Sequence, residues 1–338
     1  MTGLSDSFHR PINYLRISVT DRCNLHCIYC LPATGITLLR HNEVLTYEEL
    51  AAIARLAAEL GISKLRLTGG EPLVRANLPQ LVAMLAEIET IDDISLTTNG
   101  ILLKSFAAEL KQAGLRRVNV SLDSLKQDKF ERITRYRKLD EVLQGIEAAR
   151  ACGLNPVKVN MVVMRGINDD EIVDFAKLTI TEGWHVRFIE MMPFAADNPP
   201  DGHSISGKAN YRARFMPIHE VKEHLSGLGE LEPSKPIIGN GPAKYFRFPQ
   251  ATGTIGFISP VSQHFCFNCN RLRLTAEGKL RLCLLSDEEI DLRQPLRQGA
   301  PPEKLKQVIM EAIRAKPMKH DLSQGSIPRK RRMSQVGG

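Results

Sequence analysis

The sequence predicts an α/β fold, built as an incomplete (β/α)6 barrel of the TIM type with a smaller C-terminal α+β module. Six strand-like segments alternate with helical segments over residues 1–194. Special residues also follow nearly every strand, among them GGEP after the second, TTNG at the third and SLDS at the fourth. Alternation is typical of a parallel sheet with right-handed crossovers. Functional residues at the carboxyl ends of strands are typical of a barrel with one ring of loops.

Apolar runs define the strands, and helical periodicity defines the segments between them. The expected strands are Tyr14–Val19, Lys64–Thr68, Ile94–Thr98, Arg117–Leu122, Val157–Val163 and His185–Glu190. A capping box at Thr46 and Glu49 opens the first helix. Further helices are expected at Pro79–Ile88, Leu102–Ala113, Asp140–Cys152 and Asp169–Glu182.

The chain is expected to divide after the sixth strand. Residues 1–194 form the barrel, residues 195–210 form a loop rich in Pro, Gly and Ser, and residues 211–338 form the C-terminal module. The module has strand-like stretches at Lys244–Phe248 and Gly253–Ile258 and a helix near Glu303–Ala315. The basic run Arg329–Arg332 is interpreted as a solvated tail, and the alternative is an arm that binds nucleic acid.

Composition excludes several classes of protein. Hydrophobic residues make up 43% and charged residues 25%, which argues against a fibrous or largely disordered chain. No apolar run approaches the roughly 20 residues of a membrane span, and the polar N-terminus lacks an export signal. We therefore expect a cytoplasmic protein. The net charge of +7 suits an anionic partner but does not identify one.

A first cysteine triplet follows the first expected strand. Cys23, Cys27 and Cys30 have the spacing C-x3-C-x2-C, and in a chain without an export signal such a group points to metal rather than disulfides. Three thiolates can bind three irons of a [4Fe–4S] cluster and leave the fourth iron open. The alternative is a zinc site with His26 or a distant residue as fourth ligand. The GGEP turn favours the cluster, because paired glycines let the backbone approach a ligand closely.

A second triplet, Cys266, Cys269 and Cys283, lies in the C-terminal module. A structural zinc site would need a fourth ligand, which His264 could supply. The alternative is a second cluster with one open iron. Arg271 and Arg273 would share one face of a strand beside it, and two guanidinium forks at that place suit a polyphosphate.

The first triplet and the GGEP turn together resemble the motifs of the radical S-adenosylmethionine (SAM) superfamily. The resemblance implies a cluster whose open iron binds SAM, which one-electron reduction cleaves to a 5′-deoxyadenosyl radical. By motif position, the SAM site would be lined by Tyr29, Gly70, Ser121 and Met192, with Thr97–Asn99 nearby.

Within this superfamily, the chain closely resembles the GTP 3′,8-cyclases of molybdenum cofactor biosynthesis. The second triplet, the GPAKYF segment at Gly241–Phe246 and the terminal Gly337 and Gly338 carry this resemblance. It implies a second [4Fe–4S] cluster that binds guanine, and catalytic roles for Arg16, Gly337 and Gly338. It also implies GTP contacts at Arg16, Arg66, Thr97, Lys158, Arg187, Arg271 and Arg273.

Two other functions remain open from the sequence. One is a different two-cluster radical SAM enzyme, such as a peptide-modifying maturase, although those usually carry more cysteines in the C-terminal module. The other is a zinc-dependent nucleic-acid-binding protein, which would explain the charge but not the GGEP turn. The cyclase interpretation implies GTP as substrate and a reducing protein as electron donor. It implies no nucleic acid and no membrane partner, and either a monomer or a homodimer.

Overall fold

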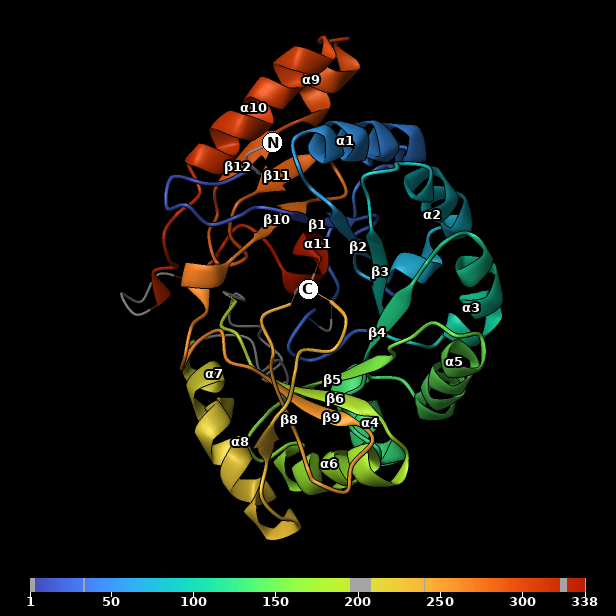
Figure 1. Cartoon of the computed structure of the whole chain (residues 1–338), viewed down its shortest axis with the longest axis vertical. Helices are drawn as coiled ribbons and strands as arrows, with labels where there is room; N and C mark the ends of the chain where they lie inside the picture. The colour runs from blue at the N-terminus through green and yellow to red at the C-terminus, as the bar shows by residue number, and fades with distance from the viewer. Residues whose placement is uncertain (1–3, 33, 195–207, 240, 323–326, 338) are drawn as a thin grey trace.

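A curved sheet of twelve strands forms the centre of the computed structural model, which describes residues 4–32, 34–194, 208–239, 241–322 and 327–337. Six parallel strands follow one another around the arc in chain order (Figure 1). They are β1 (Tyr14–Ser18), β2 (Lys64–Thr68), β3 (Asp93–Thr98), β4 (Arg117–Ser121), β5 (Lys158–Val163) and β6 (His185–Glu190). The expected parallel α/β architecture is confirmed.

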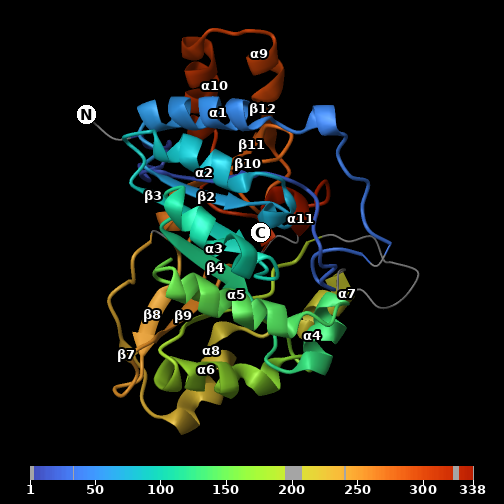
Figure 2. The same cartoon turned by 90° about the vertical axis from the view of Figure 1, so that its right-hand side faces the viewer.

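Helices cover the outer face of the arc (Figures 1 and 2). They are α1 (Tyr47–Glu59), α2 (Leu78–Ala86), α3 (Leu103–Gln112), α4 (Gln127–Thr134), α5 (Leu139–Ala151) and α6 (Ile172–Thr181). The expected capping box opens α1, because the Thr46 side chain accepts the Glu49 N–H and the Glu49 carboxylate accepts the Thr46 N–H. None of the helices in the described ranges combines the length and apolar character that a membrane span needs.

The C-terminal residues extend both ends of the same sheet. Strand β9 (Thr254–Ile258) pairs in parallel with β6, and β10 (Arg271–Leu274) pairs in parallel with β1. Antiparallel edge strands follow on each side: β8 (Lys244–Arg247) and β7 (Glu232–Pro233) beside β9, and β11 (Lys279–Arg281) and β12 (Glu289–Asp291) beside β10. The sheet therefore continues across the boundary expected near residue 211.

Five helices complete the C-terminal part of the described structure: α7 (Lys208–Arg214), α8 (Ile218–Leu225), α9 (Arg293–Arg297), α10 (Pro302–Arg314) and α11 (Met333–Val336). Most of the loop expected at 195–210 lies outside the described residues, and residues 208–210 belong to α7. Helix α11 lies inside the arc of strands (Figure 1).

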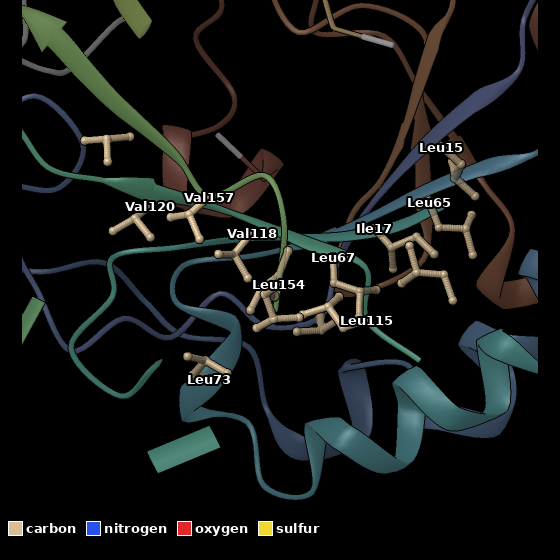
Figure 3. Packing of buried hydrophobic residues seen from close by; sticks show 14 of the residues in the cluster. Leu15, Ile17, Leu65, Leu67, Leu73, Leu115, Val118, Val120, Leu154 and Val157 are labelled. Carbon is tan, nitrogen blue, oxygen red and sulfur yellow. The ribbon is translucent and has the colours of Figure 1, made fainter. Parts of the chain in front are cut away.

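Alternation along the strands separates an apolar face from a polar face. Leu15, Ile17, Leu65 and Leu67 are buried on the side of the helices (Figure 3). Because successive side chains of a strand point to opposite faces, the residues between them point into the arc. Arg16 and Arg66 occupy such positions and lie opposite each other in the β1–β2 register.

Candidate active site

One cavity inside the arc collects most residues that the sequence analysis identified. All six cysteines of the two triplets line it. So do Tyr29, Gly70, Ser121 and Met192 of the expected SAM site, and Arg16, Arg66, Thr97, Arg187, Arg271 and Arg273 of the expected GTP site. Lys158 and Gly337 are not part of this lining, and Gly338 lies outside the described residues.

The first cysteine triplet forms a tight loop after β1. The N–H groups of Cys30 and Leu31 both donate to the Cys27 carbonyl oxygen, at 2.9 and 3.0 Å. The Arg135 guanidinium donates to the Leu31 carbonyl oxygen at 3.1 Å and supports the loop from outside. Burial raises the pKa of the Cys23 thiol to about 11 and that of Cys30 to about 12. Buried thiols of this kind become ligands when a metal centre supplies positive charge.

The GGEP turn fixes the approach of two loops. A Cβ at Gly70 would lie 2.3 Å from the Arg22 carbonyl oxygen, so only glycine fits against this backbone. Glu71 is buried and accepts the Asn99 N–H at 2.6 Å and the Thr98 hydroxyl at 2.7 Å. Burial raises the pKa of Glu71 to about 7. The turn thus joins the segment before the cysteine loop to the end of β3.

The residues expected at SAM come from separate strand ends, and one of them has a partner that sequence reasoning missed. The Tyr29 hydroxyl donates to Asp123 at 2.7 Å, and Asp123 also accepts the Val162 N–H at 2.8 Å. Burial raises the pKa of Asp123 to about 6. The available signal was the position of Asp123, two residues after Ser121 in the SLDS segment that follows β4.

The second triplet lies in a more positive environment. The Cys269 N–H donates to the Cys266 carbonyl oxygen at 3.1 Å. Burial opposes ionisation of Cys269, but Arg271 and Lys316 outweigh it and lower the pKa of this thiol to about 6. Lys316 is buried, and its ammonium donates to the Arg271 carbonyl oxygen at 3.0 Å. No motif identified Lys316, because it reaches the site from beyond the end of α10.

Four arginines from four strands meet in the interior. Arg16 lies opposite Arg66 in the β1–β2 register and opposite Arg273 in the β1–β10 register. Burial, with neighbouring guanidinium groups, lowers the pKa of Arg66 to about 10 and that of Arg273 to about 9, and it also lowers the pKa of Arg187. Buried cations that repel one another are stabilised by a bound polyanion. The arrangement therefore fits a polyphosphate.

Lys158 is the first residue of β5 and is not part of the cavity lining. Its side-chain nitrogen Nζ donates to the Ile238 carbonyl oxygen at 2.6 Å. Burial, Arg187 and Arg117 lower its pKa to about 6. Arg117 itself is ion-paired with Asp93. Lys158 is therefore mostly neutral at pH 7 in the free protein.

The C-terminal tail contacts both sides of the cavity. The Arg273 guanidinium donates to the Gly337 carbonyl oxygen at 2.7 Å. Gly337 has a φ of +70°, and a Cβ there would lie 2.5 Å from Cγ2 of Thr68, so this position requires glycine. The Ser334 backbone N–H donates to the Cys30 thiol. The tail thus lies between β10 and the first cysteine loop.

The interpretation of the basic run as a solvated tail is wrong for Arg331. Its guanidinium forms ion pairs with Glu289, at 2.7 Å, and with Glu277. The Arg331 side chain is only 14% exposed. Both carboxylates are far away in sequence, so the local charge run gave no sign of them.

The donor sets fit clusters with an open position. All seven cysteines are free thiols. Among the described residues, no three or more His, Cys, Asp or Glu side chains lie together in a way that could hold a single metal ion. Each triplet supplies three thiols and leaves one position to another ligand, which is the donor set of an open [4Fe–4S] cluster.

Comparisons with known proteins agree with this site. The model of the radical SAM superfamily matches residues 17–179, and the model called Molybdenum Cofactor Synthesis C matches residues 184–322. Among solved structures, Streptococcus suis SuiB has a TM-score of 0.58 at 15% identity, and covers 89% of this chain and 68% of its own. SuiB bound to S-adenosylmethionine has a TM-score of 0.57 at 14% identity. At such identity the likeness shows the fold alone.

Bacterial relatives match nearly the whole length of the chain. The GTP 3′,8-cyclase of Moorella thermoacetica is 51% identical over 99% of this chain and 100% of its own. The GTP 3′,8-cyclase of Heliobacterium modesticaldum is 50% identical over 98% of this chain and 99% of its own. The chain therefore belongs to the GTP 3′,8-cyclase family, which is part of the radical SAM superfamily and acts in molybdenum cofactor biosynthesis.

Proposed function

We propose that the chain binds GTP in the cavity inside the arc and joins C3′ of its ribose to C8 of its guanine, with SAM and two [4Fe–4S] clusters. One observation carries the proposal: both cysteine triplets and the buried arginines line the same cavity. Metal ligation and polyanion binding therefore meet in one space. The peptide-modifying alternative does not account for the buried arginines, and the zinc-dependent nucleic-acid-binding alternative does not account for the GGEP turn beside the first triplet.

Cys23, Cys27 and Cys30 would hold the first cluster and leave one iron for SAM. When bound, the reduced cluster and SAM supply the 5′-deoxyadenosyl radical that removes hydrogen from the ribose C3′. The role of the chain is to orient SAM and to exclude water from the radical. Tyr29, fixed by Asp123, would contact SAM, as would the backbone at Gly70.

Ser121 and Met192 complete the SAM site in this proposal. Ser121 ends β4, and Met192 follows β6, so the two residues reach the cavity from different strands. A hydroxyl can hydrogen-bond SAM, and a flexible thioether packs well against irregular apolar surface. Together with the cysteine loop they would hold SAM beside the open iron.

The triphosphate of GTP would bind the interior cations. Arg16, Arg66 and Arg187 can donate charge-assisted hydrogen bonds to phosphate oxygens, and Lys158 adds a further donor once it is protonated. Within the described structure, the buried Thr97 hydroxyl has no hydrogen-bond partner, although it lines the cavity. A bound nucleotide would supply that partner.

Cys266, Cys269 and Cys283 would hold the second cluster, with its open position toward the guanine. Arg271 and Arg273 flank this triplet and would contact the nucleotide. Arg16 and the tail residues Gly337 and Gly338 take the catalytic positions in this proposal. A glycine tail can approach a substrate closely, because it has no side chain to collide with it.

The proposal also requires electrons: one for the reductive cleavage of SAM, and one, together with a proton, to convert the C3′–C8 adduct into 3′,8-cyclo-7,8-dihydro-GTP. A reducing protein partner would provide them, with the chain acting as a monomer or a homodimer. Free cysteines are typical of proteins in the reducing cytoplasm, where we place the reaction.

The decisive experiment is anaerobic reconstitution, reduction, and incubation with SAM and GTP. Mass analysis should detect 5′-deoxyadenosine and 3′,8-cyclo-7,8-dihydro-GTP, and the protein should contain about eight irons per chain. Cys152→Ser is the matched control, because Cys152 belongs to neither triplet. This variant should keep the full iron content, whereas Cys23→Ser should lose about half of it. A protein that holds only zinc, or that forms no 5′-deoxyadenosine, contradicts the proposal.

A further inference from the structure

The C-terminal tail is held to the rest of the protein by ion pairs of Arg331, a residue with no role in the proposed reaction. Nε and Nη2 of Arg331 each donate to a different carboxylate oxygen of Glu289, both at 2.7 Å. The same guanidinium forms an ion pair with Glu277. A bidentate arginine–carboxylate pair fixes orientation as well as distance. Arg331 is therefore held by two carboxylates in one geometry.

The neighbouring residues strengthen this attachment. Asp287 accepts the backbone N–H groups of Arg329 at 2.8 Å and Lys330 at 3.2 Å. Glu289 also forms an ion pair with Arg281, whose side chain is completely buried. Arg281 ends β11, and Cys283 follows two residues later. The segment from β11 to β12 thus binds the tail through Asp287 and Glu289, and it also contains Cys283 of the second triplet.

The end of the tail depends on this attachment. Only five residues separate Arg331 from Gly337, and four of them form α11. A helix of one turn is not stable by itself. It nevertheless places the Ser334 N–H on the Cys30 thiol and the Gly337 carbonyl oxygen on Arg273. Val336 packs against Phe194 and Leu285 in a small apolar cluster.

We propose that Arg331 is a positioning residue: its ion pairs with Glu289 and Glu277 hold the C-terminal tail between the two cysteine triplets. With the tail held there, radical formation and ring closure proceed together on one bound GTP. Without the ion pairs the tail leaves this position, and the hydrogen bond from Arg273 to the Gly337 carbonyl oxygen is lost. SAM cleavage then continues, but fewer radicals lead to the cyclic product. This inference rests on the proposed function.

The test compares variants of the full-length, reconstituted enzyme at matched iron content. Arg331→Gln removes the ion pairs. Arg329→Gln is the control, because it removes the same charge from an exposed side chain of the same run. We expect Arg331→Gln to raise the ratio of 5′-deoxyadenosine to cyclic product by about tenfold or more, a loss typical of misplaced reacting groups. Arg329→Gln should keep the ratio of the unmodified enzyme.

Two further measurements keep the test decisive. Amide hydrogen exchange of residues 327–337 should become faster in Arg331→Gln and stay unchanged in Arg329→Gln. Arg331→Lys keeps the charge but not the fork, so its product ratio should fall between the two. If Arg331→Gln does not fold, Arg331→Lys carries the comparison with Arg329→Gln.

The outcomes separate this inference from the proposed function. An unchanged product ratio together with unchanged exchange in Arg331→Gln overturns the positioning role. Parallel loss of 5′-deoxyadenosine and cyclic product at matched iron content also overturns it. If the unmodified enzyme makes no cyclic product, the proposed function fails instead. The exchange comparison then still decides whether Arg331 holds the tail.

Discussion

GTP binding should draw a proton onto Lys158. In the free protein its ammonium is buried among Arg187, Arg117 and Arg66, and its pKa falls to about 6. At pH 7.5, about 3% of the molecules carry the charge. A phosphate oxygen in contact with Nζ favours the charged form and raises this pKa. Binding and protonation are therefore coupled.

The size of the coupling follows from the pKa. Protonating Lys158 at pH 7.5 costs about 2 kcal/mol, since each pKa unit corresponds to about 1.4 kcal/mol. This contribution to affinity is fully present below about pH 6 and is lost as the pH rises toward the pKa of the complex. Between pH 6 and pH 7.5 it should weaken GTP binding by about fifteenfold.

Calorimetry of the reconstituted enzyme tests this coupling. Titrations with GTP in two buffers of different ionisation enthalpy measure proton uptake, and a pH series measures affinity. The terminal phosphate of GTP also titrates, near about pH 6, so the quantity of interest is the difference from Lys158→Gln. The unmodified enzyme should take up about one proton more than the variant at pH 7.5. Equal proton uptake and parallel affinity profiles would refute the reasoning.

Three further predictions concern the second triplet and its neighbours. Cys283→Ser should abolish the cyclic product but retain 5′-deoxyadenosine formation; equal loss of both at matched occupancy of the first cluster would contradict the separate roles of the clusters. Arg273→Ala should weaken GTP binding by about tenfold or more and leave SAM binding nearly unchanged, whereas calorimetry showing equal losses would count against a phosphate contact. In metal-free protein, peptide mapping after iodoacetamide treatment should give half-maximal alkylation of Cys269 near pH 6, because Arg271 and Lys316 favour its thiolate; a midpoint near about pH 8.5 would show an ordinary thiol.

Local pattern was sufficient to predict the barrel strands. The segment His185–Glu190 was expected as a strand and is β6, and Arg117–Leu122 differs from β4 by one residue. Each is a short run of apolar or alternating residues between turns, and such a run predicts a strand from local sequence alone. The pairing of β10 with β1 joins segments that are far apart in the chain. No local period encodes such a contact.

The candidate site likewise has features that local sequence predicts and features that it does not. Cysteine spacing and the GGEP turn are local, so the sequence identified them. Asp123 binds Tyr29 across 94 positions, and Arg331 binds Glu289 across 42. The SLDS segment drew attention to Asp123 itself, but a pairing between residues so far apart has no signature in one sequence. Charge runs are misleading for the same reason, since exposed Arg329 and paired Arg331 look alike before folding.

The two-residue period of the strands also separates stability from function. Leu15, Ile17, Leu65 and Leu67 bury their side chains against the helices, which favours folding. Arg16 and Arg66 point the other way, where burial and mutual repulsion disfavour their charge. The apolar side chains that point outward, toward the helices, thus stabilise the sheet, and the sheet in turn holds the arginines close together on its inner face. A substitution at an outward position should therefore act first on unfolding, and one at an inward position first on the affinity for an anion.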